Sequence, residues 1–356
     1  MEVHLIAGAR PNFMKIAPVH RAIVADGRLK ARFIHTGQHY DAALSDQIMS
    51  DLGLPSPDHH LGVGSGNASR QTARILDAID PIFDEHPPAA LIVVGDVTST
   101  LAATLAAANR EIPVAHVEAG LRSFDWSMPE ERNRCVVDRL SRWLFVTERS
   151  GIENLTNEGM TEGVHLVGNV MIDSLLQILP RTDSAPLRDK LELDGAYTVV
   201  TLHRPGNVDG VAQFRRLIAS LAPLAEEAPL IFPVHPRTRE ALNGVDLPDG
   251  FKLVDPLGYL EFVSLVKDAA LVCTDSGGLQ EETTVLGVPC ITLRPNTERP
   301  ITIDEGTNVR IFDDLSQVRE YGSKALAGDW KEGRRPDLWD GETAPRIVEV
   351  LAQELA

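Results

Sequence analysis

Short apolar runs alternate along the chain with longer segments of helical periodicity. The first half contains VHLIA, MKIAPVHRAIVAD, RFIHT, DAALSDQIMSDL, ALIVVGD, TSTLAATLAAANR and PVAHVE. The second half contains TVVTLH, FRRLIASLAPLAEEA, LIFPVH, FKLVDP, LEFVSLVKDA and LVCTD. This alternation is typical of βαβ units, in which helices cover both faces of a parallel sheet. The sequence therefore predicts an α/β protein in which the same architecture occurs twice.

A weakly patterned segment separates the two series. Residues 179–195, LPRTDSAPLRDKLELDG, contain two prolines and no strand pattern, so we interpret them as a linker. The length of 356 residues also suits two domains. We therefore expect an N-terminal domain at 1–178 and a C-terminal domain at 196–340. Both would be doubly wound, Rossmann-like domains facing a cleft, with ligands at the carboxyl ends of the strands.

Charge and cysteine content exclude several classes of protein. The net charge is −17 and the pI is near 5.1, which argues against nucleic acid or an anionic membrane as a partner. The first residues, MEVHLIAGAR, lack a basic region followed by a long apolar stretch, so we expect a cytoplasmic protein. Three separated cysteines without a CxxC pattern predict neither a disulfide nor a metal site.

The end of the first predicted strand reads GARPNFMK and lacks the GxGxxG pattern of dinucleotide sites. Arg10 leaves the strand, Pro11 suits the first turn of a helix, and Lys15 follows one turn later. Cations at a helix N-terminus suit a phosphate or a phosphorylated leaving group. A surface arginine beside a helix-starting proline explains the stretch equally well.

Carboxylates gather at strand ends and helix starts of the first half. Asp96 follows ALIVV, Glu118 follows PVAHV, and Glu130 lies in the loop that leads to the predicted helix NRCVVDRLSRW. Converging carboxylates can carry out general acid and base chemistry near neutral pH. The alternative for Asp96 is an ordinary helix cap. We interpret Asp125 and Glu131 as structural or solvated.

The second half offers a second set of polar groups after strands. His203 follows TVVTL, and Ser276, Gly277 and Gly278 open a helix whose free N–H groups could cradle a diphosphate. Glu282 comes one turn later and could accept hydrogen bonds from ribose. A glycine turn before an acidic helix start is the structural alternative.

Seven motifs together resemble the non-hydrolysing UDP-N-acetylglucosamine 2-epimerase family. In order and spacing they are GARPNFMKIAP, HTGQHYD, GDVTST, HVEAGLRS with PEERNR, the HR of TLHRP, CTDSGGLQEE and NTERP, within about the first 310 residues. The resemblance implies a glycosyltransferase B fold and a C-terminal helix at 341–356 that packs back on the first domain. It also implies a homodimer without cofactor or metal.

The resemblance implies interconversion of UDP-GlcNAc and UDP-ManNAc. UDP would leave by anti elimination to give 2-acetamidoglucal, and would return after the C2 proton has been exchanged. The resemblance implies that Asp96, Glu118 and Glu130 are the catalytic acids and bases. It implies that the catalytic residues also include Lys15, Arg134 and His203, which together with Arg10 would stabilise the departing diphosphate. The remaining UDP-binding residues would be Ser276, Gly277, Gly278, Glu282 and Arg299. Which carboxylate serves which face of C2 stays open.

Several alternatives remain at this point. A relative could epimerise a UDP-diacetamido-uronic acid, or hydrolyse the substrate to ManNAc and UDP. A glycosyltransferase of the same fold would need an acceptor pocket, and a non-catalytic UDP-sugar sensor would bind without turnover. The biological pathway, whether a cell-surface polysaccharide or a secondary metabolite with an amino sugar, is also open.

Three departures from the family pattern bear on regulation. Asn12 replaces an acid, and we expect it at the cleft rim. The stretch 203–206 reads HRPG where many bacterial members have HRRE, and Asp41 stands where some have Gln or Glu. Because those members use these stretches for activation by a second UDP-GlcNAc, we expect that activation to be lost. Sigmoidal rates at low substrate, or reversal from UDP-ManNAc only with added UDP-GlcNAc, would contradict this expectation.

Overall fold

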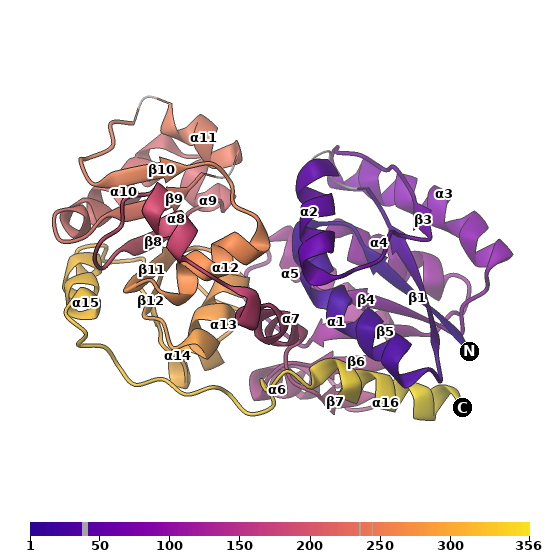
Figure 1. Cartoon of the computed structure of the whole chain (residues 1–356). Coiled ribbons are helices and arrows are strands. Elements are labelled where there is room, and N and C mark those ends of the chain that lie inside the picture. The colour runs from indigo at the N-terminus through magenta and orange to yellow at the C-terminus, as the bar shows by residue number, and fades with distance from the viewer. Residues whose placement is uncertain (38–41, 235, 244) are drawn as a thin grey trace. The chain divides into compact units, whose positions relative to one another are not determined.

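The computed structural model describes residues 1–37, 42–234, 236–243 and 245–356. The chain forms two compact units, coloured along the chain in Figure 1. Unit 1 comprises residues 1–177 and 337–356, and unit 2 comprises residues 178–336. These boundaries differ from the expected 1–178 and 196–340.

The first parallel sheet lies in unit 1 and has the strand order β3-β2-β1-β4-β5-β6-β7 within the described residues. The order reverses between β1 and β4, as in a doubly wound fold. The strands are β1 (Glu2–Ala7), β2 (Lys30–His35), β3 (His59–His60), β4 (Ala90–Val94), β5 (Val114–Ala119), β6 (Trp143–Val146) and β7 (Val164–Leu166).

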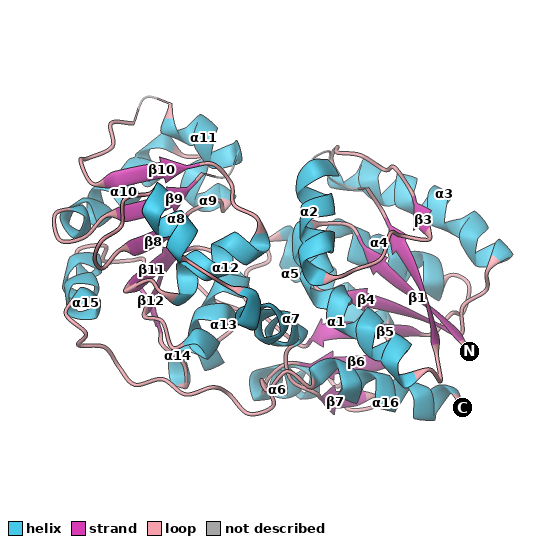
Figure 2. Cartoon of the chain, viewed as in Figure 1, coloured by secondary structure: helices cyan, strands magenta, loops and turns pink. Residues whose placement is uncertain are grey.

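Helices cover both faces of this sheet, as Figure 2 shows. Helix α3 buries Ile75, Ile79 and Ile82, whose spacing places them on one face. The helices of unit 1 are α1 (Arg10–Asp26), α2 (Ala42–Leu52), α3 (Ala68–Glu85), α4 (Thr98–Ala108), α5 (Pro129–Leu140), α6 (Arg149–Asn157), α7 (Val170–Ile178), whose last residue belongs to unit 2, and α16 (Thr343–Leu355).

The sheet of unit 2 is also parallel, with the order β10-β9-β8-β11-β12-β13. Its strands are β8 (Thr198–Thr201), β9 (Leu230–Pro233), β10 (Phe251–Val254), β11 (Leu271–Thr274), β12 (Cys290–Thr292) and β13 (Asn308–Arg310). The helices that follow β8 in this unit are α9 (Pro205–Val208), α10 (Val211–Ala225), α11 (Pro236–Leu242), α12 (Tyr259–Lys267), α13 (Gly277–Leu286), α14 (Ile301–Asp304) and α15 (Gln317–Leu326).

The prediction that residues 179–195 form a linker between the domains is wrong. It holds a 3-10 helix, η1 (Leu179–Arg181), and α8 (Ala185–Lys190), and it belongs to unit 2. Each of its two prolines lies in the first turn of a helix, where the missing N–H costs nothing. Leu187 and Leu193 pack into a core cluster of unit 2 with Tyr197.

The C-terminal segment returns to unit 1. Helix α16 packs against α1 (Figure 1), and the buried indole of Trp339 donates to the carbonyl of Thr147 at 3.0 Å. The side chain of Asp173 on α7 accepts backbone N–H bonds from Thr343 at 3.2 Å and Ala344 at 2.7 Å. A carboxylate from another helix therefore caps α16.

Among the described residues, no helix is both long enough and apolar enough to span a membrane.

Removing this cap should loosen the C-terminal helix. We expect Asp173→Ala to lower the free energy of unfolding by at least about 1 kcal/mol, because two buried N–H groups lose their acceptor. Trypsin should also cleave faster at Arg346. Urea unfolding and limited proteolysis measure both effects. Glu354→Ala removes an exposed carboxylate from the same helix and serves as the control. Equal stability and cleavage of the two variants would contradict the capping role.

Candidate functional site

Unit 1 brings together four of the residues predicted from sequence. Lys15 lies in α1, Asp96 follows β4, Glu118 lies near the end of β5, and Arg134 lies in α5. Lys15 forms an ion pair with Glu118, and Arg134 forms one with Asp96. Gly95, between β4 and Asp96, lies beside the first pair, so the two ion pairs form one cluster. The cluster lies at the carboxyl ends of the strands, as doubly wound folds predict.

Glu118 has an unusual backbone. Its φ is +74°, in the left-handed region that non-glycine residues rarely adopt. The pairing of β5 with β6 shifts register between Val117 and Ala119, which marks a bulge at Glu118. Bulges redirect side chains beside active sites, and strained residues cluster at functional sites. The backbone therefore singles out Glu118 as a functional candidate.

The Lys15 and Glu118 pair is nearly closed to solvent, with side chains 9% and 5% exposed. Gly95 makes room for it. A Cβ atom at Gly95 would lie 2.9 Å from Nζ of Lys15 and 3.3 Å from Oε2 of Glu118, and φ of Gly95 is +64°. Both the space and the backbone conformation thus require glycine at this position.

The second ion pair joins Asp96 to α5. The guanidinium of Arg134 contacts Oδ2 of Asp96 and lies 3.1 Å from Oε2 of Glu131. The side-chain amide of Asn133 donates to the carbonyl of Asp96 at 2.8 Å. Since Arg134 is buried between two carboxylates, its first task is to hold Asp96 and the start of α5 in place.

Helix α5 begins earlier than predicted. It starts at Pro129, so Glu130 and Glu131 lie in its first turn and not in a loop. Proline is favoured at this position of a helix. Glu131 is buried, and it accepts from N and Oγ of Ser123 at 2.9 Å each and from N of Phe124 at 2.8 Å. Glu131 therefore fixes the preceding loop.

Two further sequence predictions concern the first turn of α1. The side chain of Arg10 lies outside the described residues, as do His39 and Asp41. Asn12 is only 2% exposed, so its expected place at a rim is wrong. Its amide accepts from the N–H groups of Gly8 and Ala9 and donates to the carbonyl of Val94 at 3.1 Å. An ionised acid has no proton to donate to this carbonyl, which explains the amide.

Glu130 is half-buried, and no hydrogen bond or ion pair joins its carboxylate to another residue in the described ranges. Its position near the N-terminus of α5 places a negative charge where the helix dipole favours one.

In unit 2, the side chain of His203 contacts Asp275, a residue that the sequence analysis did not predict. Nδ1 of His203 lies 3.1 Å from Oδ1 of Asp275, which is fully buried at the end of β11. Asp275 also accepts from the backbone N–H groups of His203 and Arg204 and from the amide of Asn207. Burial raises the pKa of Asp275, but these hydrogen bonds outweigh it and hold the pKa below its usual value. The only sequence signal was its place between a strand and the glycine turn.

The glycine turn opens α13 as predicted. Oγ of Ser276 accepts from the N–H of Leu279 at 3.5 Å, and a Cβ at Gly277 would lie 2.6 Å from Nη1 of Arg299. A side chain at Gly277 would therefore have to displace the guanidinium of Arg299. Gly278 follows within the first turn.

The other two predicted UDP residues are buried and paired. Glu282 in α13 accepts from the hydroxyl of Tyr259 at 2.8 Å. Nη1 of Arg299 donates to Glu298 at 3.3 Å, and its Nε lies 2.9 Å from Glu281 at an angle outside hydrogen-bond geometry. The guanidinium of Arg299 thus lies against the glycine turn with its charge balanced by carboxylates.

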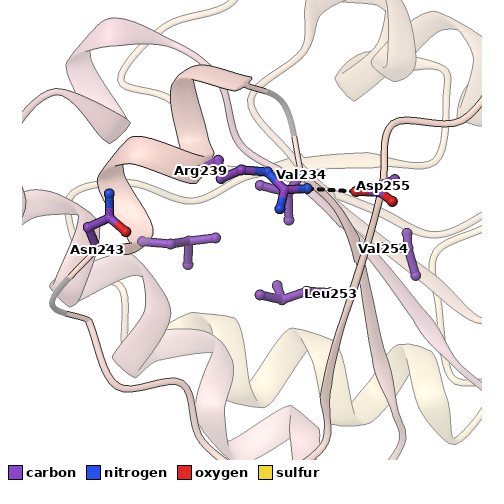
Figure 3. A pocket seen from close by; sticks show the side chains of 7 residues that line it. Val234, Arg239, Asn243, Leu253, Val254 and Asp255 are labelled. Carbon is purple, nitrogen blue, oxygen red and sulfur yellow. Dashed lines mark hydrogen bonds and ion pairs between the residues drawn. The ribbon is translucent and has the colours of Figure 1, made fainter.

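A small pocket of about 270 Å³ lies between α11 and the ends of β9 and β10 (Figure 3). An ion pair of 2.7 Å between Arg239 and Asp255 crosses it. The lining residues are Val234, Arg239, Leu242, Asn243, Leu253, Val254 and Asp255. None of the residues predicted from sequence lines this pocket. In the described part of the chain, no cluster of His, Cys, Asp or Glu has an arrangement that could hold a metal ion.

Comparisons with known proteins place the chain in one family. The sequence model described as UDP-N-acetylglucosamine 2-epimerase matches residues 21–352, past the 310 residues over which the motifs occur. A UDP-N-acetylglucosamine 2-epimerase of Methanocaldococcus jannaschii is 36% identical, with 99% of both chains covered. The UDP-2,3-diacetamido-2,3-dideoxy-D-glucuronate 2-epimerase of Pseudomonas aeruginosa is also 36% identical, over 99% of this chain and all of that one.

A solved structure extends the comparison to the fold. The M. jannaschii UDP-GlcNAc 2-epimerase in complex with UDP-GlcNAc and UDP has a TM-score of 0.89 and 36% identity, and covers 99% of this chain and 100% of its own. This likeness and the two parallel sheets confirm the predicted pair of Rossmann-like domains. Together, the motifs, the fold and the relatives show that this chain belongs to the UDP-N-acetylglucosamine 2-epimerase family.

Proposed function

We propose that this protein is a non-hydrolysing UDP-GlcNAc 2-epimerase that interconverts UDP-GlcNAc and UDP-ManNAc. The observation that carries the proposal is the cluster at Gly95, where Lys15 pairs with Glu118 and Arg134 pairs with Asp96. A chain that only bound UDP-sugar would have no use for the buried carboxylate of Glu118 on a strained backbone beside the half-buried carboxylate of Asp96. An enzyme that moves a proton on its substrate needs such carboxylates as acid and base.

The reaction needs carboxylates because the C2 hydrogen is not beside a carbonyl group. Departure of UDP must first develop positive charge at C1, which makes the C2 hydrogen acidic. The C1–O bond then breaks with its electron pair going to UDP, a carboxylate takes the C2 proton, and the C1=C2 bond of 2-acetamidoglucal forms. A proton delivered to the opposite face of C2 and return of UDP to C1 give the epimer.

In unit 1 we assign proton transfer and stabilisation of the C1 cation to Asp96, Glu118 and Glu130. Lys15, next to Glu118, would also attract the departing diphosphate, as would Arg10. We assign Arg134 to the orientation of Asp96, since its guanidinium is already buried between Asp96 and Glu131.

In unit 2 we assign UDP binding to the glycine turn and its surroundings. N–H groups of Ser276, Gly277 and Gly278 at the start of α13 suit a diphosphate. Glu282, oriented by Tyr259, suits the ribose hydroxyls. His203, oriented by Asp275, would donate a hydrogen bond to the phosphates, and the guanidinium of Arg299 would add positive charge beside them.

We further propose a cytoplasmic homodimer that needs neither cofactor nor metal. The absence of CxxC pairs from the sequence suits a reducing compartment, and the net charge of −17 argues against a nucleic acid or an anionic membrane as a partner. Light scattering that gives twice the chain mass of 38.8 kDa would support the dimer.

The substrate is identified by testing a panel of UDP-sugars, because two relatives that are equally identical to this chain are named for different sugars. We expect the purified protein, without added metal or cofactor, to convert UDP-GlcNAc into UDP-ManNAc, as followed by proton NMR. Free ManNAc with UDP would identify a hydrolysing enzyme instead. Turnover of UDP-2,3-diacetamido-2,3-dideoxy-glucuronate alone would move the protein to that substrate. No turnover of any UDP-sugar would contradict the proposal.

A pair of variants separates chemistry from binding. We expect Glu118→Gln to lower kcat by at least ~100-fold, the usual scale for a lost general acid or base, with unchanged UDP affinity. We expect Glu282→Ala to weaken UDP binding, because the ribose loses an acceptor. Calorimetric titration with UDP and steady-state kinetics measure the two effects. Near-normal kcat in the first variant, or an unchanged Kd in the second, would refute the corresponding role.

A further inference from the structure

His116 is a buried histidine that the proposed mechanism does not use. It lies on β5, two residues before Glu118, and is 0% exposed. Its Nδ1 lies 2.6 Å from Oδ1 of Asp138 on α5, and its Nε2 lies 2.8 Å from the carbonyl oxygen of Gly95. Both ring nitrogens therefore have a close partner.

Both of these partners are hydrogen-bond acceptors. A backbone carbonyl has no proton to donate. The other oxygen of Asp138 accepts from Nη1 of Arg122 at 2.7 Å and from the N–H of Gly120 at 3.1 Å. Burial raises the pKa of Asp138, whereas its ion pair with Arg122, whose guanidinium does not deprotonate in proteins, lowers it. Asp138 is therefore an ionised carboxylate that only accepts.

A neutral imidazole has one N–H and one lone pair, so it can satisfy only one of two acceptors. We propose that His116 is a buried imidazolium, and that it acts as a positioning residue for Glu118 and Asp96. The part of this inference that concerns catalysis rests on the proposed epimerase function. The part that concerns the proton on the ring does not.

The position of the network explains what the charge achieves. Asp138 holds the side chain of His116, two residues before Glu118, and the N–H of Gly120, two residues after it. A left-handed non-glycine residue costs about 1–3 kcal/mol and persists only where its surroundings determine it strongly. The hydrogen bonds of Asp138 to His116 and to Gly120 therefore fix the backbone on both sides of the strained Glu118.

The second hydrogen bond of His116 fixes the residue that follows β4, because it is donated to the carbonyl oxygen of Gly95. Gly95 has no side chain and so leaves room for the Lys15 and Glu118 pair. Asp96 is the next residue. Loss of the imidazolium would therefore let Gly95, Asp96 and Glu118 shift, and small misplacements of reacting groups cost about 100-fold in rate.

Charge balance makes a buried cation tolerable here. Arg122 donates to Asp138 and forms two further bonds, of 2.7 and 2.9 Å, with Glu158. His116 and Arg122 supply two positive charges, and Asp138 and Glu158 supply two negative ones. A balanced, hydrogen-bonded network avoids an isolated buried charge.

The charge of the ring is tested directly by NMR of the full chain labelled with 15N-histidine at neutral pH. We expect two ring N–H signals from His116, assigned by their loss in His116→Gln. His4 is the internal reference, because it is fully buried and burial lowers its pKa to about 4, which keeps its ring neutral. A single protonated nitrogen on His116 would overturn the proposal, whatever the activity of the enzyme.

The positioning role is tested by kinetics on wild-type substrate turnover. We expect His116→Gln to lower kcat on the order of 100-fold with KM changed by less than about threefold, since binding residues are untouched. His4→Gln is the matched control and should keep the wild-type kcat. Asp138→Asn gives a second test that leaves His116 in place. It should remove one ring N–H signal of His116 and lower kcat similarly. Unchanged kcat in both site variants, or a change in KM alone, would overturn the positioning role.

Discussion

The strained backbone of Glu118 is the constraint on which the site of unit 1 depends. A bulge in β5 turns this carboxylate toward Lys15, and Gly95 leaves space for the pair. Such a conformation is unfavourable in isolation, so it needs support from elsewhere in the chain. Asp138 supplies that support from α5 by holding residues on both sides of Glu118. The same helix carries Glu130 and Arg134, so one packed element positions most of the candidate site.

Unit 2 uses a buried aspartate in a comparable way. Asp275 lies at the end of β11 and gathers N–H donors from His203, Arg204 and Asn207. It fixes the direction of the His203 ring and the start of α9 beside the glycine turn. In each unit, therefore, a buried carboxylate orients polar groups of the candidate site.

Much of the fold follows from local sequence, and much of the site does not. The alternation of apolar runs predicted eight of the strands, β1, β2, β4 and β5 in unit 1 and β8 to β11 in unit 2, because a buried parallel strand must be nearly all apolar. Pro180 and Pro186 contributed to the interpretation of 179–195 as a linker, yet each lies in the first turn of a helix, where proline is favoured. Short elements such as β3 and β7 carry too few residues to show a period.

The candidate acids and bases were predicted from their places after strands, whereas His116, Asp138 and Asp275 were not assigned. Their roles depend on hydrogen bonds between residues about 20 to 70 positions apart, such as His116 with Asp138 and His203 with Asp275. Asn12 shows the same limit, because its burial follows from a bond to Val94 on another strand. Sequence indicates which groups are available, while packing decides which of them are buried and paired.

The central claim is that carboxylates of unit 1 exchange the C2 proton of a UDP-sugar with solvent during epimerisation. The most direct measurement follows UDP-GlcNAc in D2O by proton NMR with the purified protein. We expect deuterium to replace hydrogen at C2 of the UDP-ManNAc as it forms, and Glu118→Gln to slow product formation and exchange together. UDP-ManNAc that keeps its original C2 hydrogen would rule out proton exchange with solvent at this carbon.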